Sequence, residues 1–157
     1  MSYTGITIKD AMEKINTEWF LPAIQRPYVW GSRYNSERYI CKLFDSLYQK
    51  YPIGVLIFWE TKNAVAHREF LRDYHQGDVY KNVEEGLWIR HKNLVYDGQQ
   101  RLQTLYSCLK YTFNDRILVF DLAYNRDADT DGETGFRFID KKEDLKPTEI
   151  KMNQLLV

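Results

Sequence analysis

The segment from Leu94 to Leu105 combines residue types that can bind an anion. A short apolar run stops at Asp97, and apolar residues then recur at helical spacing. Asp97 suits the N-cap of that helix, and Gln100 stands where a capping box takes Glu or Gln. Gly98 lets the backbone approach a bound group, and Arg101 follows within one turn. Free amides, the positive end of a helix dipole and a guanidinium would converge here, which predicts a phosphate site.

An ordinary strand-to-helix turn would use the same residues differently. Asp97 would only cap the helix and Arg101 would point into solvent, since Asp-Gly turns are common. The neighbouring Gln99 and Gln100 favour the binding hypothesis, because their donors and acceptors could read a base or a ribose.

A second polar and aromatic segment runs from Gln25 to Trp30. Pro27 keeps the preceding Arg26 out of helical geometry, so this piece is extended. Arg26 could bind a second set of phosphate oxygens, with Gln25 as a polar contact to the ligand. Tyr28 and Trp30 could line the same site, or they could pack on the core.

Other motifs with chemical potential are incomplete. Cys41 and Cys108 fall on apolar helical faces, which indicates reduced core residues, and the three histidines lack metal-ligand spacing. Residues 127–132 match the first half of an EF-hand loop, but Phe138 stands where the bidentate Glu belongs, so we expect a solvated hairpin loop. Neither a Gly-x-Ser-x-Gly nucleophile motif nor a Walker P-loop is present, so a nucleotide would bind by another scheme.

Composition limits the partners. The 22 basic and 22 acidic side chains cancel, which argues against binding nucleic acid through bulk charge and leaves a local basic cleft open. The 157 residues suit one domain, 1–157, with a real core. There is no signal sequence or membrane-spanning apolar run, so we expect a soluble, cytoplasmic protein without membrane contacts.

Periodicity predicts the elements that would position these residues. Thr7 and Asp10 form a capping box before a helix whose apolar face holds Ile8, Ala11, Met12 and Ile15. Further helices are expected at Ser36 to about Tyr51 and at Gly98 to about Tyr111, the second with Leu102, Leu105, Tyr106 and Leu109 facing inward. Extended segments are expected at 19–24, 55–59, 87–89 and 94–96, with Pro22 at a strand edge or bulge and 55–59 as a buried strand. Residues 117–122 and 136–139 are expected to form a hairpin.

Two segments are less regular. Residues 61–91 read as a long excursion holding one short helix or hairpin, which could cover a pocket or form a partner surface. Residues 141–157 are charged and then apolar and stop without a cap, so we expect a chain cut from something longer.

Three blocks together resemble the N-terminal domain of GmrSD-type restriction endonucleases, a family similar in fold to ParB and sulfiredoxin. They are LPAIQRPYVW (21–30), YPIGVLIFW (51–59) and LVYDGQQRLQTL (94–105), and the match covers roughly residues 5–125. The resemblance implies an α+β fold with a mixed sheet flanked by helices. It also implies a nucleoside-triphosphate-binding and hydrolysing domain that regulates cleavage of modified DNA in phage defence. The family's Asp-Gly-Gln-Gln-Arg signature maps onto Asp97, Gly98, Gln99, Gln100 and Arg101, and its Gln-Arg block maps onto Gln25 and Arg26, with the aromatics Tyr28 and Trp30.

The leading hypothesis is therefore a nucleotide-dependent regulatory domain. Arg26 and Arg101 would neutralise the phosphates, and Mg²⁺ would bridge their oxygens. Asp97 and Arg101 are the catalytic candidates; Asp97 could hold the metal through water, although its capping role competes. No general base stands out, so binding is better supported than hydrolysis.

The alternative is a non-enzymatic DNA-recognition module in which Tyr28 or Trp30 stacks on a modified base. An interaction domain with a decayed pocket is a third reading. Full-length relatives carry a C-terminal His-Asn-His nuclease that this chain lacks, so we expect no DNA cleavage by these residues alone. DNA would be reached through a nuclease domain or a partner subunit.

Overall fold

The computed structural model describes residues 4–83, 92–125 and 134–156. It contains helices and a mixed sheet, so the predicted α+β class is confirmed. In chain order the elements are α1 (Ile8–Lys14), β1 (Trp19–Pro22), α2 (Ser36–Tyr48), β2 (Ile57–Thr61), β3 (His67–Arg68), β4 (Lys92–Asp97), α3 (Gln99–Lys110), β5 (Arg116–Asp121), β6 (Phe136–Asp140), β7 (Glu149–Lys151) and the 3-10 helix η2 (Met152–Gln154).

The first sheet has the strand order β2-β4-β1-β3. β1 runs parallel to β4 and antiparallel to β3, and β2 runs antiparallel to β4. The two halves of β1 have different partners: Trp19 and Phe20 pair with β4, whereas Leu21 and Pro22 pair with β3. Pro22 is thus the last residue of an inner strand. Because this residue is not paired with β4, the lack of an N–H on proline costs no hydrogen bond to β4.

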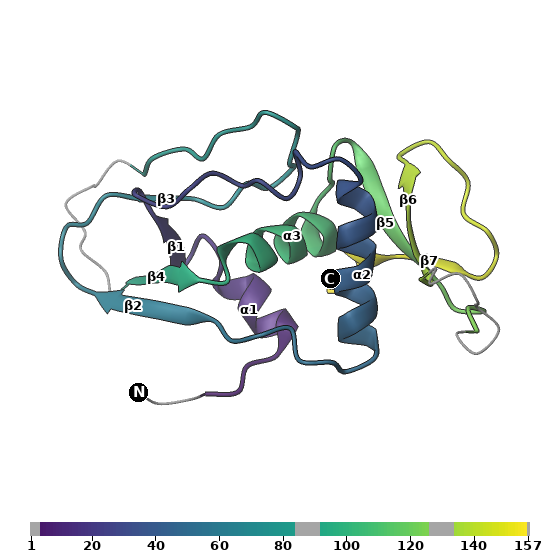
Figure 1. Ribbon diagram of the computed structural model, residues 1–157, viewed down its shortest axis with the longest axis horizontal. Coiled ribbons are helices and arrows are strands. Elements are labelled where there is room, and N and C mark those ends of the chain that lie inside the picture. The colour runs from purple at the N-terminus through teal and green to yellow at the C-terminus, as the bar shows by residue number, and fades with distance from the viewer. Residues whose placement is uncertain (1–3, 84–91, 126–133, 157) are drawn as a thin grey trace.

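The second sheet has the order β6-β5-β7 and is antiparallel throughout. The predicted hairpin is confirmed as β5 and β6, while β7 and η2 arise from a charged segment whose sequence gave no periodic signal. Figure 1 shows α3 running from the first sheet toward α2, with the second sheet beyond α2.

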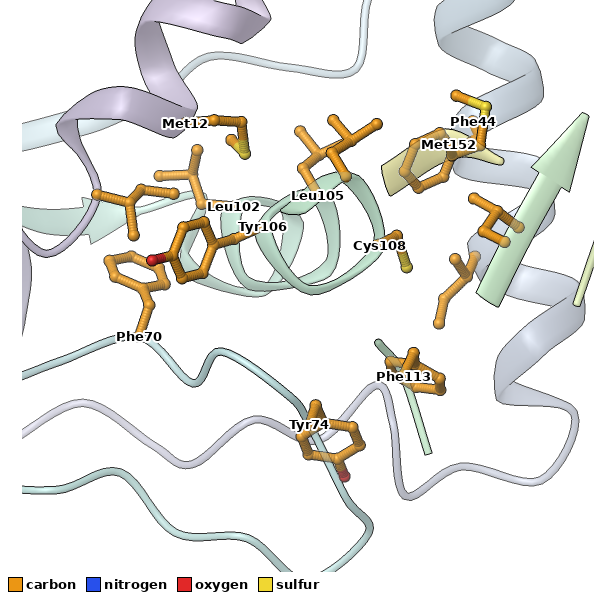
Figure 2. Packing of buried hydrophobic residues seen from close by; sticks show 14 of the residues in the cluster. Met12, Phe44, Phe70, Tyr74, Leu102, Leu105, Tyr106, Cys108, Phe113 and Met152 are labelled. Atoms are coloured by element: carbon orange, nitrogen blue, oxygen red, sulfur yellow. The ribbon is translucent and has the colours of Figure 1, made fainter. Parts of the chain in front are cut away.

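Helix α3 is the centre of the core. Ten of its 12 residues are buried, including the predicted inward-facing Leu102, Leu105, Tyr106 and Leu109. Figure 2 shows α3 side chains packed among residues from the surrounding elements, such as Met12, Phe44, Phe70, Tyr74, Phe113 and Met152. Because α3 is buried on every side, it also buries polar residues such as Gln103 and Thr104. Each of these side chains is hydrogen bonded, as buried polar groups usually are.

Several local predictions are confirmed. Thr7 caps α1, since its Oγ1 accepts from the Asp10 amide (3.1 Å) and donates to the Asp10 carboxylate (2.6 Å). The apolar face of α1 buries Ala11, Met12 and Ile15, although Ile8 is exposed. Cys41 and Cys108 are free thiols in the core, as predicted.

The prediction of a buried strand at 55–59 is wrong. The strand is β2, two residues further along, and it lies at the edge of its sheet with Ile57 and Trp59 exposed. An apolar run predicts that a segment is a strand but not where that strand lies in the sheet. The position of β2 depends on its pairing with β4, more than 30 residues later.

The excursion predicted at 61–91 has no helix among its described residues 61–83; after Thr61, the last residue of β2, the only strand in this described part is β3. Its inner side chains Phe70, Tyr74 and Tyr80 are buried. The predicted strand at 87–89 and the calcium-like loop at 127–132 lie outside the described residues. Within the described part of the chain, no helix is long and apolar enough to cross a membrane.

Candidate functional site

The candidate site lies where β4 ends and α3 begins. Asp97 is the last residue of β4, and Gly98 is the N-cap of α3 with φ 96°. The prediction that Asp97 caps α3 in a box with Gln100 is therefore wrong, because the left-handed glycine separates Asp97 from the helix and no side chain caps it. This φ is one that L side chains rarely adopt, and a Cβ on Gly98 would also lie 2.3 Å from Leu56 Cδ2, so the turn favours glycine.

Without a side-chain cap, the first turn of α3 keeps free donors. The first hydrogen bond of the helix runs from Leu102 N to Gly98 O (2.9 Å), and no acceptor for the amides of Gln99, Gln100 and Arg101 lies within the described residues. These amides add to the positive end of the helix dipole, a combination that attracts anions.

The two glutamines of the motif hold the segment 25–30 against α3. Gln100 Oε1 accepts from Val29 N (2.9 Å) and its Nε2 donates to Pro27 O (3.1 Å). Gln99 Nε2 donates to Arg26 O (2.7 Å) and to the Tyr80 hydroxyl (3.2 Å). Both carboxamides are buried and engaged with the protein, which leaves little of them to read a base.

Segment 25–30 also contributes side chains of its own. Gln25 Nε2 donates to Tyr96 O (3.1 Å), which ties the segment to the end of β4. The Arg26 side chain is exposed and has no hydrogen-bond or ion-pair partner within the part of the chain that the structure describes. Its charge is thus available to a ligand.

Arg101 fixes a second stretch of chain beside the same turn. Its guanidinium donates to Ile53 O (2.7 Å) and Val55 O (2.8 Å), and it lies 3.4 Å from Asp97 Oδ2. Gly54 makes room for it, because a Cβ there would lie 2.6 Å from Arg101 Nη1. Arg101 is not a solvent-facing side chain: it stays 16% exposed and keeps its charge next to the turn.

These residues enclose a pocket of about 160 Å³. Its lining consists of Gln25, Arg26, Trp30, Tyr96, Asp97, Gly98, Gln99, Gln100 and Arg101. The structure therefore brings together every predicted site residue except Tyr28.

Tyr28 lies in the core. Its hydroxyl bonds to Thr104 Oγ1 (2.7 Å), its ring contacts Tyr74 edge-on, and its burial raises its pKa above the ordinary tyrosine value. Tyr96, by contrast, was missed by the sequence reading. It is exposed at the pocket and stands immediately before the motif, a position that could have singled it out.

The donor set limits the metal chemistry of the pocket. Asp97 is the only carboxylate in its lining, and the described residues contain no group of three or more His, Cys, Asp or Glu able to hold a metal ion. Mg²⁺ commonly takes one or two carboxylates, keeps several waters and adds substrate phosphates. The pocket thus fits a Mg²⁺ ion that arrives with phosphates better than a resident ion.

The fold and site define an α+β domain with a polar pocket at the uncapped start of its central helix. The family model of the GmrSD restriction endonuclease N-terminal domain matches residues 8–156, nearly the whole chain. The chain belongs to this family, as the sequence motifs indicated, and is thereby a component of a modified-DNA restriction system. No protein in the curated comparison matches the chain.

Proposed function

We propose that this domain binds a nucleoside triphosphate by its phosphates at the N-terminus of α3 and hydrolyses it to regulate restriction of modified DNA. One observation carries the proposal: three amides and the Arg26 side chain, all without a partner among the described residues, meet the half-buried charge of Arg101 in one pocket. Each attracts an anion, and together they suit a polyphosphate.

The size of the pocket limits what enters it. Small-molecule sites usually enclose roughly 300–1,000 Å³, whereas this pocket encloses about 160 Å³. It therefore receives the phosphates, and the nucleoside lies outside against an aromatic surface. Tyr96, which is exposed, and the half-buried Trp30 both line the rim and are suited to that role.

Asp97 would oppose phosphates unless a cation lies between them. Its carboxylate is 61% exposed and is only weakly engaged by Arg101, so it can hold a Mg²⁺ ion directly or through water. Bound Mg²⁺ would neutralise the charge that develops on the transferred phosphoryl group. The chain's own contribution is then positional: the α3 amides and Arg26 fix the phosphates, and Asp97 orients the ion.

A DNA-recognition module is the second candidate. The exposed Arg26 and Tyr96 beside one pocket favour it, because together they could hold a backbone phosphate and stack on a base. The net charge of zero weighs against a protein that relies on this surface alone.

A thermal-shift titration with each common nucleoside triphosphate and Mg²⁺ tests the proposal. At a ligand concentration about 100 times Kd, stabilisation is about 2.7 kcal/mol, or roughly 5–10 °C in Tm. Arg26→Ala should abolish most of this shift without lowering the Tm of the free protein, because the Arg26 side chain has no hydrogen-bond or ion-pair partner among the described residues and its carbonyl contact to Gln99 is retained. Arg33→Ala is the matched control, since Arg33 is also exposed but lies outside the pocket.

Release of inorganic phosphate, measured by a malachite-green assay, separates hydrolysis from binding. Asp97→Asn should preserve triphosphate binding but make that binding independent of Mg²⁺. A Tm that no triphosphate raises, together with salt-dependent binding of modified duplex, would instead establish the DNA-recognition alternative.

A further inference from the structure

A second and larger cavity lies on the opposite side of α2 from the first sheet. It encloses about 750 Å³, within the range of roughly 300–1,000 Å³ that is usual for small-molecule sites. Helix α2 and strand β6 form its main walls, and the ends of β5 and β7 complete it. The proposed triphosphate pocket shares no residue with it.

The acidic residues in this cavity are already engaged by the protein. Glu37 accepts from Arg116 (2.6 Å), and Glu149 accepts from Arg137 through both oxygens (2.7 and 2.9 Å). The Arg137 contact lowers the pKa of Glu149 to about 2, so this carboxylate stays charged and paired. Asp121 is held by hydrogen bonds from Thr148 and the Ala123 amide, which lower its pKa as well.

Two basic residues remain uncompensated. Arg38 and Lys42 are exposed, line the cavity and have no ion-pair partner among the described residues. They stand four residues apart on α2, so they project from the same face of the helix. Lys146 adds a third charge from the opposite wall, 3.7 Å from Glu149.

The cavity also offers aromatic surface. Its lining includes the half-buried Tyr124 and the more deeply buried Phe136. An anion attached to a planar, apolar group could pair with Arg38 and Lys42, which have no ion-pair partner in the described part of the chain, and could pack against the aromatic lining. Basic side chains beside an aromatic platform are the features by which proteins hold single-stranded nucleic acid.

We propose that this cavity binds the phosphate ester of a nucleoside, with Arg38 and Lys42 on the phosphate and the base against Tyr124. Such a group could belong to a nucleic acid strand or to a free nucleotide. The proposal does not depend on triphosphate binding at α3.

Fluorescence anisotropy with a labelled single-stranded oligodeoxynucleotide tests the proposal. The full chain carrying Arg26→Ala serves as background, so that the α3 pocket does not contribute. Adding Arg38→Ala and Lys42→Ala should weaken binding at least about tenfold and lower the salt slope by about 0.7, the contribution of one neutralised phosphate on a single strand. Adding Lys9→Ala and Lys110→Ala removes the same charge from other exposed positions and is the matched control.

The outcomes are distinct. Displacement of the strand by a nucleoside monophosphate assigns the cavity to a single nucleotide, and displacement only by another strand assigns it to nucleic acid. Equal losses in the two double variants, or no binding of either probe, would overturn the proposal. Should the alanine variant melt early, Arg38→Gln with Lys42→Gln retains the side-chain stems and provides the same comparison.

Discussion

Gln100 accepts a hydrogen bond from the Val29 amide, 2.9 Å away, although the two residues stand 71 positions apart in the chain. The same carboxamide donates to Pro27 O. The Gln100 side chain thus holds segment 25–30, the opposite wall of the pocket, in place. Gln99 and Arg101 do the same for Arg26 and for residues 53–55.

Gln100→Ala should destabilise the protein by about 2–4 kcal/mol, because it leaves the Val29 amide and the Pro27 carbonyl without a partner. Urea denaturation measures the change. Gln76→Ala is the control, since the Gln76 side chain is exposed, and it should shift stability by less than about 0.5 kcal/mol. Equal effects of the two substitutions would contradict the bracing role.

Gly98→Ala should be more damaging than Gly77→Ala. Both glycines have a positive φ (96° and 97°), so both substitutions strain the backbone, at about 1 kcal/mol or more. Only at Gly98 does the added Cβ meet a neighbour, Leu56 Cδ2 at 2.3 Å, whereas nothing lies within 4 Å at Gly77. Thermal melts of both variants, with Gly5→Ala as an unstrained reference, isolate the steric part.

Tyr28→Phe distinguishes a core tyrosine from a ligand-binding one. The substitution removes the hydrogen bond to Thr104 Oγ1 and should cost about 1 kcal/mol of stability. The affinity for triphosphate should not change, because Tyr28 does not line the pocket. A large loss of affinity in a correctly folded variant, measured by calorimetric titration, would restore the original assignment of Tyr28 to the site.

The Arg137–Glu149 pair should make the fold sensitive to acid. Folding lowers the Glu149 pKa from 4.5 to about 2, so the pair's stabilisation is fully present above pH 4.5 and is lost as pH falls toward 2. Glu149→Gln should therefore lower stability at pH 7 and flatten its dependence on pH between 4.5 and 2. Equilibrium unfolding at a series of pH values tests this, and an unchanged slope would contradict it.

The sequence predicted most of the site but not how its residues act. Local patterns located the turn at Gly98, the helix after it and the Gln-Arg segment, because those signals depend on neighbouring residues. The pairing of Gln99 and Gln100 with segment 25–30 connects residues more than 70 positions apart, so spacing along the chain could not reveal it. A pair of adjacent glutamines looked like ligand groups for that reason.

The misplaced strand has the same cause, whereas the misplaced cap has a local one. Burial of 55–59 depended on which strand would become the edge, a property of the assembled sheet. The cap of α3 depended on one left-handed residue, since the turn at Gly98 shifted the helix start by one position and released Asp97 to the pocket.

The hydrogen bonds that join α3 to its flanking segments span 46 to 73 residues of sequence. Contacts of such long range are slow to form, because the intervening loops must close first. The pocket therefore exists only once these segments and the central helix have come together. A nascent or partly folded chain would have no competent site, so ligand capture reports that this domain has completed its native structure.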